Sequence, residues 1–262
     1  PARPSKTERP ARRPASRVWR IVRGVIGLFA GIAIFGTIAG GVVAWAMYER
    51  YSANLPDLEK VRQYQPPVMS RVYSDDARLM AELASERRIF VPIGSIPKIV
   101  QEAFISAEDQ HFWTHRGVDP GAIVRAALSN LQHYGQGRRP VGASTITQQV
   151  AKNMLLGNEV SFARKIREMI LATRIEEALP KEHILELYLN EIYLGSGAYG
   201  VAAAAQTYFD KSLDRITLPE AAFLAALPKA PANYTPFTAP DAARVRRDWV
   251  IDRTFVDDEG NR

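Results

Sequence analysis

The sequence predicts a mainly helical protein with a small β element and one N-terminal transmembrane helix. An uncharged run from Gly24 to Tyr48 is long enough to cross a bilayer. From Ile96 onward, apolar residues recur mostly at helical spacing, and strand-like segments are confined to about residues 69–93. The chain has no cysteine, so a disulfide or a thiolate metal site is excluded.

Positive charge is concentrated at the N-terminus. Residues 1–23 contain eight Lys or Arg and one Glu, a net of +7, whereas the rest of the chain holds 26 basic and 27 acidic residues. The overall charge of +6 therefore belongs to a basic tail. The main body lacks the cationic excess of a nucleic-acid-binding domain, and we expect no nucleic acid partner.

The run 24–48 predicts a transmembrane anchor. Its 25 uncharged residues exceed the roughly 20 that a helix needs to cross the hydrocarbon core. Trp45 and Tyr48 suit one membrane interface, and the basic tail favours a cytoplasmic N-terminus. A cleaved signal peptide would have a shorter apolar run. We therefore expect a single-pass protein of the cell (inner) membrane, with its main domain on the outer, periplasmic side.

The segment after the anchor predicts a connector and a hairpin. The connector, residues 49–69, contains a short helix, and strands at 69–73 and 78–83 flank an acidic turn. Ile89–Ile93 predicts a third short strand. The expected organisation is a cytoplasmic tail at 1–23, an anchor at 24–48, a connector at 49–69, a main domain at 70–250 and a tail or linker start at 251–262.

A first motif, EDQHFWTHRGVD, occupies residues 108–119. It follows a predicted helix that starts near Pro97 and ends at Glu108, and Asp119-Pro120 predicts the start of another helix that runs to about Leu131. A carboxylate where a helix enters such a loop can be half-buried, and its pKa then rises into the range useful for proton transfer. The alternative is an acidic helix end followed by a small aromatic core.

A second motif, GASTITQQVAKN, occupies residues 142–153 after a loop at 133–140 that is expected to be mobile. It predicts a helix capped by Ser144. Thr145, Gln149 and Lys152 then share one polar stripe, which could bind sugar hydroxyls and a phosphate. A solvated helix face is the alternative. The apolar stripe expected to face the core consists of Ile146, Val150 and Met154.

A third motif, RKIREM, begins at Arg164. Arg164 and Glu168 are four residues apart and Lys165 and Glu168 are three apart, so they share a helix face. Alone, this pattern indicates a surface ion pair worth a few tenths of a kcal/mol. Together with the first two motifs, it predicts a second carboxylate in a cation-lined cleft.

The fourth motif, ELYLNEIYLGSGAYG, follows a helix start at Pro180. Glu186 and Asn190 lie on one helix face, and we interpret them as structural groups that tie helices together. Further helices are expected at 201–208 and 219–227. The run Arg244–Phe255 is expected to begin a linker.

These motifs, followed by LPKAPANYTP, resemble in kind and order those of the peptidoglycan glycosyltransferase (transglycosylase) domain. That domain occurs in class A penicillin-binding proteins and in monofunctional transglycosylases, and the resemblance covers about residues 70–250. It implies a lysozyme-like fold with head and jaw lobes. It also implies polymerisation of lipid II into glycan strands by inverting transfer, with β-1,4 bonds formed and undecaprenyl pyrophosphate released.

The resemblance also implies roles for individual residues. Glu108 is the expected general base for the acceptor 4-hydroxyl, and Glu168 the second catalytic carboxylate, on the pyrophosphate side. A divalent cation, Mg or Mn, is expected with uncertain ligands, and no protein residue is assigned to it. The expected partners are lipid II, the growing glycan strand, the membrane and cell-wall synthesis proteins. The expected substrate-binding residues are Asp109, Phe112, His115, Gly117, Thr145, Gln149, Lys152, Asn153, Arg164, Lys165 and Lys229.

Three alternatives remain open on the residues alone. A lysozyme-like glycan-cleaving enzyme shares an active-site carboxylate but does not need the cations of the second and third motifs. A non-catalytic, membrane-anchored cell-wall scaffold does not need both Glu108 and Glu168. A metal site on His111 and His115 is disfavoured because no HExxH pattern or further ligand set accompanies them.

Overall fold

The computed structural model describes residues 17–53, 55–64, 70–76, 79–83, 87–136, 141–157, 159 and 161–254. The chain divides into two units, residues 1–53 and residues 54–262. In the first unit, a single helix, α1 (Arg17–Ser52), contains the predicted run 24–48. Its stretch Trp19–Ser52 contains an 18-residue window with a mean hydropathy of 2.1, so by length and composition it is a candidate for a single membrane span.

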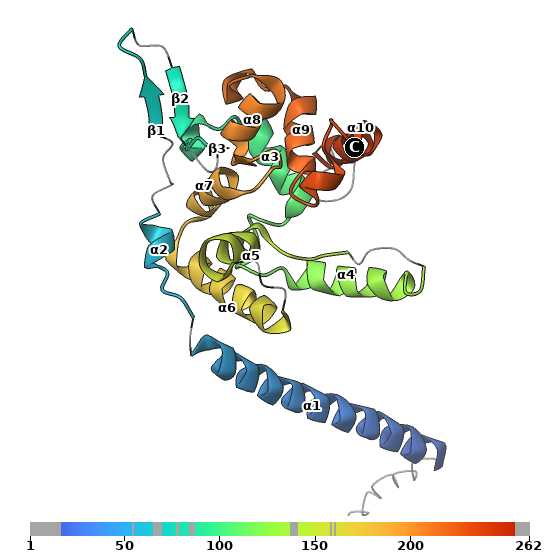
Figure 1. The fold of residues 1–262 in the computed structure, drawn as a ribbon. Coiled ribbons are helices and arrows are strands. Elements are labelled where there is room, and N and C mark those ends of the chain that lie inside the picture. Colours follow the sequence, from blue (N-terminus) through green and yellow to red (C-terminus); the bar gives the residue numbers. More distant parts are fainter. Residues whose placement is uncertain are drawn as a thin grey trace, which may run out of the picture. The chain divides into compact units, whose positions relative to one another are not determined.

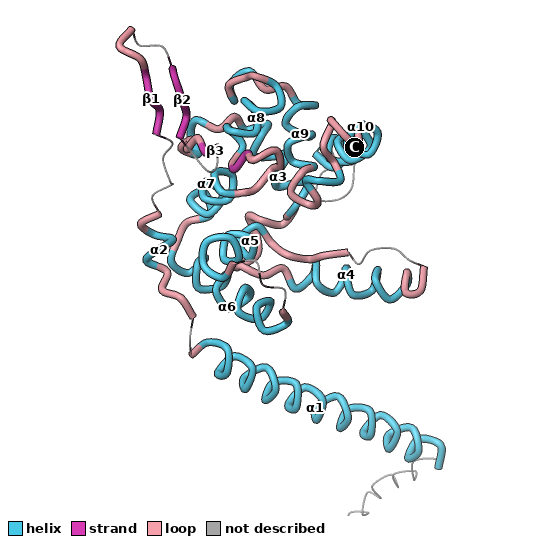
Figure 2. The backbone as a smooth tube through the Cα atoms, viewed as in Figure 1, coloured by secondary structure: helices cyan, strands magenta, loops and turns pink. Residues whose placement is uncertain are grey.

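In its described residues the second unit consists mostly of helices, and the strands there form two small pairs (Figure 2). After the short helix α2 (Glu59–Arg62), the strands β1 (Ser70–Tyr73) and β2 (Leu79–Leu83) form the predicted antiparallel hairpin, in which Ser70 is paired with Leu83. Residues 65–69, the end of the connector expected to lead into it, lie outside the described residues.

The prediction of a third strand at Ile89–Ile93 is wrong. The strand β3 is Arg87–Arg88, which pairs in parallel with β4 (Ala198–Tyr199). Beyond it, the backbone of Val91 bonds instead to the side chain of Asn190, whose Oδ1 accepts from the Val91 nitrogen at 2.8 Å. Because an amide side chain satisfies this backbone group, the segment needs no neighbouring strand. A 3-10 turn (Ile93–Ser95) follows.

Apart from α10, the helices that build the rest of this unit lie close to the predicted positions. They start where the sequence places a proline or an N-cap: Pro97 precedes α3, and the Asp119 side chain accepts a hydrogen bond from the Ala122 nitrogen at the start of α4. Their bounds are α3 (Lys98–Glu108), α4 (Pro120–Gln132), α5 (Ile146–Ala151), α6 (Phe162–Ala178), α7 (Lys181–Glu191), α8 (Val201–Phe209), α9 (Leu218–Ala226) and α10 (Pro240–Thr254).

The predicted cap of the second motif is wrong by one residue. Thr145, not Ser144, caps α5, with its hydroxyl accepting from the Gln148 nitrogen and the Gln148 side chain accepting from the Thr145 nitrogen. This reciprocal arrangement is a capping box, and it satisfies two backbone donors that a Ser144 cap would leave open. The helix then widens into a π-helical turn at Lys152–Leu156, η2, and a 3-10 turn at Leu213–Arg215 and another at Pro231–Asn233 occur later.

The core joins two sets of helices. In one set, α3, α9 and α10 pack on one another, and in the other α5 packs on α6 and α7 (Figure 1). Phe104 of α3 and Leu189 of α7 are fully buried in the same hydrophobic cluster, with Ile146 and Val150 of α5. The predicted apolar stripe of the second motif therefore faces the core.

Helix α10 corrects the expectation of a linker at Arg244–Phe255. The helix continues to Thr254, beyond the expected boundary at residue 250, and Phe255 lies outside the described residues. Ala243 and Val250, two turns apart, are buried, and Arg253 Nε donates to the Ser106 carbonyl at 3.0 Å. A stripe of only two small apolar residues suffices because the helix lies against α3 and α9.

The interpretation of Glu186 and Asn190 as structural groups is confirmed. Glu186 Oε2 accepts from the Ile93 nitrogen at 2.7 Å, and Asn190 pairs with Val91 through both of its amide atoms. Both residues thus tie α7 to the segment before α3. The loop expected to be mobile at 133–140 is described only to residue 136.

Candidate active site

Glu108, the last residue of α3, is a partly buried carboxylate that faces the second motif. Gln149 Nε2 donates to Glu108 Oε2 at 2.7 Å. Burial raises the pKa of Glu108 above its ordinary value, although the Gln149 hydrogen bond and the charges of Arg246 and Lys229 act against this rise. A carboxylate in this state accepts a proton more readily than an ordinary surface Glu.

Asp109, next in the chain, anchors this part of the site. Its Oδ2 accepts from the Ile146 nitrogen at 2.9 Å and lies 2.8 Å from His115 Nε2. The carboxylate therefore ties the first motif to the first turn of α5. Because Gln149 lies one turn further along α5, this contact sets the distance between Gln149 and Glu108.

Behind Asp109 lies a buried network of charges. Glu176 of α6 accepts from Thr147 Oγ1 at 2.5 Å and from Lys181 Nζ at 2.7 Å, and His115 Nδ1 lies 3.6 Å away. The Lys181 ammonium also lies 4.5 Å from the ring centre of Phe112. Each buried charge here has an opposite charge or a hydrogen-bond partner, as a buried polar group requires.

Gly117 brings the first motif against α6. Its φ of +84° is in the left-handed region, and a Cβ at this position would lie 2.6 Å from the Ala172 carbonyl carbon. The Gly117 carbonyl accepts from Thr145 Oγ1 at 2.6 Å. Only glycine allows this approach of loop to helix, and the Thr145 hydroxyl then fixes it.

Glu168 of α6 is held by its own helix. Its side chain is 3% exposed, and it forms an ion pair with Arg164 and a second one with Lys165 Nζ at 2.8 Å. Lys165 Nζ also donates to Ser144 Oγ at 2.7 Å. The third motif is thus joined to the start of the second.

Lys152 is a cation on which the charges of both carboxylates act. It opens the π-helical turn after α5, and within the described residues it has no carboxylate at ion-pair distance. Burial lowers its pKa, with Arg164 and Lys165 acting in the same direction, whereas the charges of Glu168 and Glu108 raise it. A partly buried ammonium near both carboxylates is suited to bind an anion.

Comparison with known proteins decides the family. Residues 76–255 match the family model described as Transglycosylase. The chain belongs to the transglycosylase family. This match includes all four motifs and continues through α10, which agrees with the packing of that helix in the structure.

Relatives of this transglycosylase domain are named penicillin-binding protein 1A. The protein of that name from Rickettsia felis is 52% identical over 230 residues, which is 88% of this chain and 29% of the relative. That from Aquifex aeolicus is 48% identical over 229 residues, 87% of this chain and 30% of the relative. The chain thus spans less than a third of the length of these relatives. The predicted enzyme class, peptidoglycan glycosyltransferase, is confirmed by the family.

A solved structure is also similar. It is penicillin-binding protein 1A from Haemophilus influenzae, with 27% identity and a TM-score of 0.41, covering 75% of this chain and 20% of that chain.

The structure separates the predicted site residues of the transglycosylase domain into two kinds. Four of them, Asp109, Phe112, Gly117 and Thr145, are buried. They support the site from behind: the Asp109 and Thr145 side chains are hydrogen-bonded within the protein, and a role of these four residues in substrate binding stays a prediction. The His115 side chain is 4% exposed, and its Nε2 contacts Asp109 Oδ2. The residues that remain accessible are Gln149, Lys152, Asn153, Arg164, Lys165 and Lys229.

The two histidines of the first motif contact different carboxylates. His115 contacts Asp109, and His111 Nδ1 lies 2.8 Å from Asp119 Oδ2. These contacts suit residues that orient the loop. Within the described ranges, no three His, Asp or Glu side chains are grouped as metal ligands. Both Glu168 oxygens are occupied by cations, so these residues do not by themselves make a metal site.

Sequence reasoning missed several residues around the site. Glu176 and Lys181 look like ordinary surface charges in sequence, and no spacing rule links them to His115. Arg246 was missed because its run was interpreted as a linker. A helix start at Pro240 followed by Ala243 and Val250 at seven-residue spacing was the signal that could have found it.

Proposed function

We propose that this transglycosylase domain polymerises lipid II into peptidoglycan glycan strands. The observation that carries the proposal is the partly buried Glu108, whose pKa is raised, next to a cation group formed by Lys152, Arg164 and Lys165. A base and a cationic site for a phosphate leaving group are the two requirements of glycosyl transfer from a lipid pyrophosphate.

Glu108 serves as the general base. It takes the proton of the acceptor 4-hydroxyl while that oxygen bonds to C1 of the donor sugar. The C1–oxygen bond to the pyrophosphate breaks, and the undecaprenyl pyrophosphate leaves with the electron pair. Direct displacement without a covalent enzyme intermediate inverts C1 and makes the β-1,4 bond. The Gln149 amide holds Glu108 toward this position.

The cation group takes up the charge of the leaving pyrophosphate. Lys152 has no carboxylate partner within the described residues and is available to a phosphate. Arg164 and Lys165 are held in place by Glu168, whose role is to position them. A divalent cation, Mg or Mn, remains a prediction. Bound to the pyrophosphate, it would add positive charge there.

A lipid-linked substrate requires the site to work at a membrane. Helix α1 is the candidate span, with the N-terminus on the cytoplasmic side by the positive-inside rule. Helix α4 adds support, since Val124, Leu128 and Leu131 on it are exposed apolar side chains suited to lipid contact.

The decisive test is the choice of substrate. Purified chain in detergent is given lipid II or polymeric sacculus, and we expect polymer growth with release of undecaprenyl pyrophosphate from lipid II. Breakdown of the sacculus instead would identify a lysozyme-like hydrolase. Binding to the sacculus without turnover of either substrate would indicate a scaffold.

A matched pair of variants tests the base. Glu108→Gln should lower kcat about 10²–10⁴-fold, the usual contribution of a general base. Glu102→Gln, an exposed residue of the same helix, should polymerise at the normal rate. Normal polymerisation by Glu108→Gln would remove Glu108 from the mechanism.

A further inference from the structure

A second group of cations lies where α9 and α10 pack on α3, the helix that ends at Glu108. It consists of Lys229, which follows α9, and of Arg246 and Arg253, two turns apart on α10. In the part of the chain that the structure describes, none of the three has a carboxylate at ion-pair distance. We call these three residues the α10 cation group.

Both arginines of this group stack on the same aromatic side chain, that of Trp249. The guanidinium carbon of Arg246 lies 3.7 Å from the ring centre of Trp249, and that of Arg253 lies 4.6 Å from it. Stacking on an indole fixes a guanidinium in place without neutralising it. The group is therefore rigid and still positively charged.

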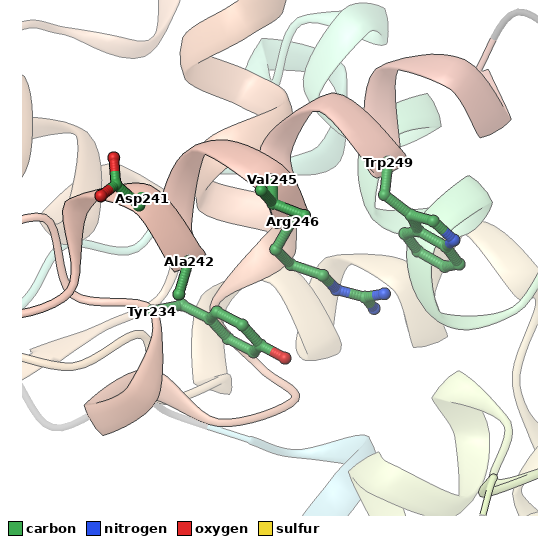
Figure 3. Close-up of a pocket in the computed structure, with 6 residues that line it drawn as sticks. All are labelled: Tyr234, Asp241, Ala242, Val245, Arg246 and Trp249. Atoms are coloured by element: carbon green, nitrogen blue, oxygen red, sulfur yellow. The ribbon is translucent and has the colours of Figure 1, made fainter. Parts of the chain in front are cut away.

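Arg246 also lines a cavity of about 450 Å³. Its side chain and that of Trp249 extend from α10, and Tyr234 faces them from the preceding segment (Figure 3). The one carboxylate at this cavity, Asp241, lies at the opposite end from the Arg246 guanidinium (Figure 3). Arg246 Nε is buried and has no hydrogen-bond partner. The Arg246 guanidinium thus keeps one donor that the described protein groups leave unused.

The charges around the group point to an anionic ligand. Burial lowers the pKa of both Lys229 and Arg246, the nearby Arg246 lowers that of Lys229 further, and the charge of Glu108 opposes both shifts. Holding like charges together in this way is unfavourable for folding. A ligand with two negative charges would relieve the repulsion.

The α10 cation group is separate from the group around Glu168. The group around Glu168 is carried by the π-helical turn after α5 and by α6, whereas the α10 cation group is carried by α10 and the segment after α9. The charge of Glu108 acts on Lys152 in one group and on Arg246 in the other, so each group can serve as an anion site near the base.

Two anion sites match the chemistry of the proposed reaction, on which this inference rests. Both substrates carry a pyrophosphate: that of the donor leaves, and that of the acceptor stays bound one disaccharide away from the attacking hydroxyl. We propose that the α10 cation group binds the pyrophosphate of the acceptor. The cations around Glu168 then serve the donor alone.

A two-substrate assay tests this assignment. A preformed lipid-linked glycan strand serves as the donor, lipid II serves as the acceptor, and the full chain is used in detergent. Arg246→Gln and Arg253→Gln should each raise KM for the acceptor about tenfold, the effect of losing a hydrogen bond to a charged group, and leave KM for the donor unchanged. Arg164→Gln should instead raise KM for the donor and leave KM for the acceptor unchanged.

Two further variants keep the test specific. Arg247→Gln, on the same helix but paired with Asp248 at 2.6 Å, should leave both KM values unchanged. Arg246→Lys, which retains the charge, should recover part of the acceptor affinity. An equal rise in both KM values, or no rise in either, for Arg246→Gln would overturn the proposal.

Binding of inorganic pyrophosphate, followed by calorimetry, reports on the site without turnover. The unsubstituted chain should bind pyrophosphate at two sites, and Arg246→Gln should lose one of them. Vesicles of anionic phospholipid test the other source of phosphate. If such vesicles, and not pyrophosphate, bind in an Arg246-dependent way, the group contacts bilayer headgroups and the acceptor assignment is wrong.

Failure of the proposed function would look different. If the unsubstituted chain forms no polymer from lipid II, both proposals fail, whatever the titration shows. If polymer forms and Arg246→Gln leaves KM for the acceptor unchanged, only the acceptor assignment fails.

Discussion

Glu108 and Glu168 belong to one site, but the chain holds them in different ways. The partners of Glu168 are three and four residues before it on the same helix. The partner of Glu108 is Gln149, 41 residues later, and Gln149 is placed by the contact of Asp109 with the first turn of α5. Glu168 is thus held locally, whereas Glu108 is held by the tertiary structure.

The difference has a chemical consequence. Two cations neutralise Glu168, which suits a residue that keeps other charges in position. Among the residues that the structure describes, Glu108 has only the Gln149 amide within hydrogen-bond distance, and burial raises its pKa. The carboxylate without a paired cation is the better base, because a close ion pair would hold its pKa low.

The largest effect on stability is expected from disturbing the tertiary contacts that hold the first motif, which contains Glu108, against α6. Gly117→Ala should destabilise the protein by about 4 kcal/mol, because the Cβ would overlap the backbone of Ala172 and the left-handed conformation adds strain. The measurement is the free energy of unfolding in denaturant.

Gly135→Ala is the matched control for that substitution. Gly135 has a similar φ of +81°, but a Cβ there would meet open space, so only about 1 kcal/mol of backbone strain is expected. If both substitutions lower the free energy of unfolding equally, the contact of the loop with α6 contributes nothing to stability.

The same substitution should have opposite effects at the two carboxylates. Glu168→Gln leaves Arg164 and Lys165 unpaired and should cost about 2 kcal/mol, less than a fully buried pair because Lys165 is 38% exposed. Thermal unfolding at pH 7 should show a Tm lower by about 4–8 °C.

Glu108→Gln should instead raise Tm at pH 7. A folded-state pKa above the ordinary value means that Glu108 contributes stability at low pH and that this contribution is lost as the pH rises through the raised pKa. The difference in Tm between the Glu108→Gln variant and the unsubstituted chain should therefore shrink as the pH falls. Glu177→Gln, exposed on α6, should leave Tm nearly unchanged. A fall in Tm at pH 7 for Glu108→Gln would contradict the raised pKa.

A smaller loss of stability is expected when the buried charge network of Glu176 and Lys181 is disturbed. Lys181→Met leaves Glu176 without its cation and should destabilise the protein by about 1–2 kcal/mol. It should also lower kcat with KM unchanged, because the network positions Glu108 without touching substrate. Lys181→Arg should restore most of kcat.

The control for Lys181 is Lys211→Met. That residue forms a surface pair with Glu220 at 2.7 Å, and its loss should cost less than 1 kcal/mol and leave kcat intact. If Lys181→Met behaves like Lys211→Met in both measurements, the network has no positioning role.

The smallest effect on stability, but a clear one on pH dependence, is expected at Gln149. Gln149→Met removes the hydrogen bond that favours ionised Glu108, so the pKa of Glu108 should rise further. The acidic limb of kcat/KM should then shift to higher pH, with Gln206→Met, on the exposed face of α8, as the control. An unshifted limb would mean that another group titrates in this range.

Local signals explain most of what the sequence predicted correctly. The positions of α3, α4, α6 and α7 follow from prolines, N-caps and apolar spacing, which act within a few residues. The errors have the opposite origin. The strand expected at Ile89–Ile93 is replaced by bonds to Asn190, about a hundred residues later, and the linker expected at Arg244–Phe255 is a helix because α3 and α9 cover it.

The sequence by itself determined the long apolar helix that is the candidate span, the four motifs with their family, and the pairing of Glu168 with Arg164 and Lys165. Hydrophobic length and helical spacing are properties of neighbouring residues. Only the tertiary structure decided that Thr145 and Asp109 are buried supports, that Glu108 has a raised pKa, and that Arg246 lies near it. Burial and long-range electrostatics depend on which distant segments meet, and no local pattern encodes that meeting.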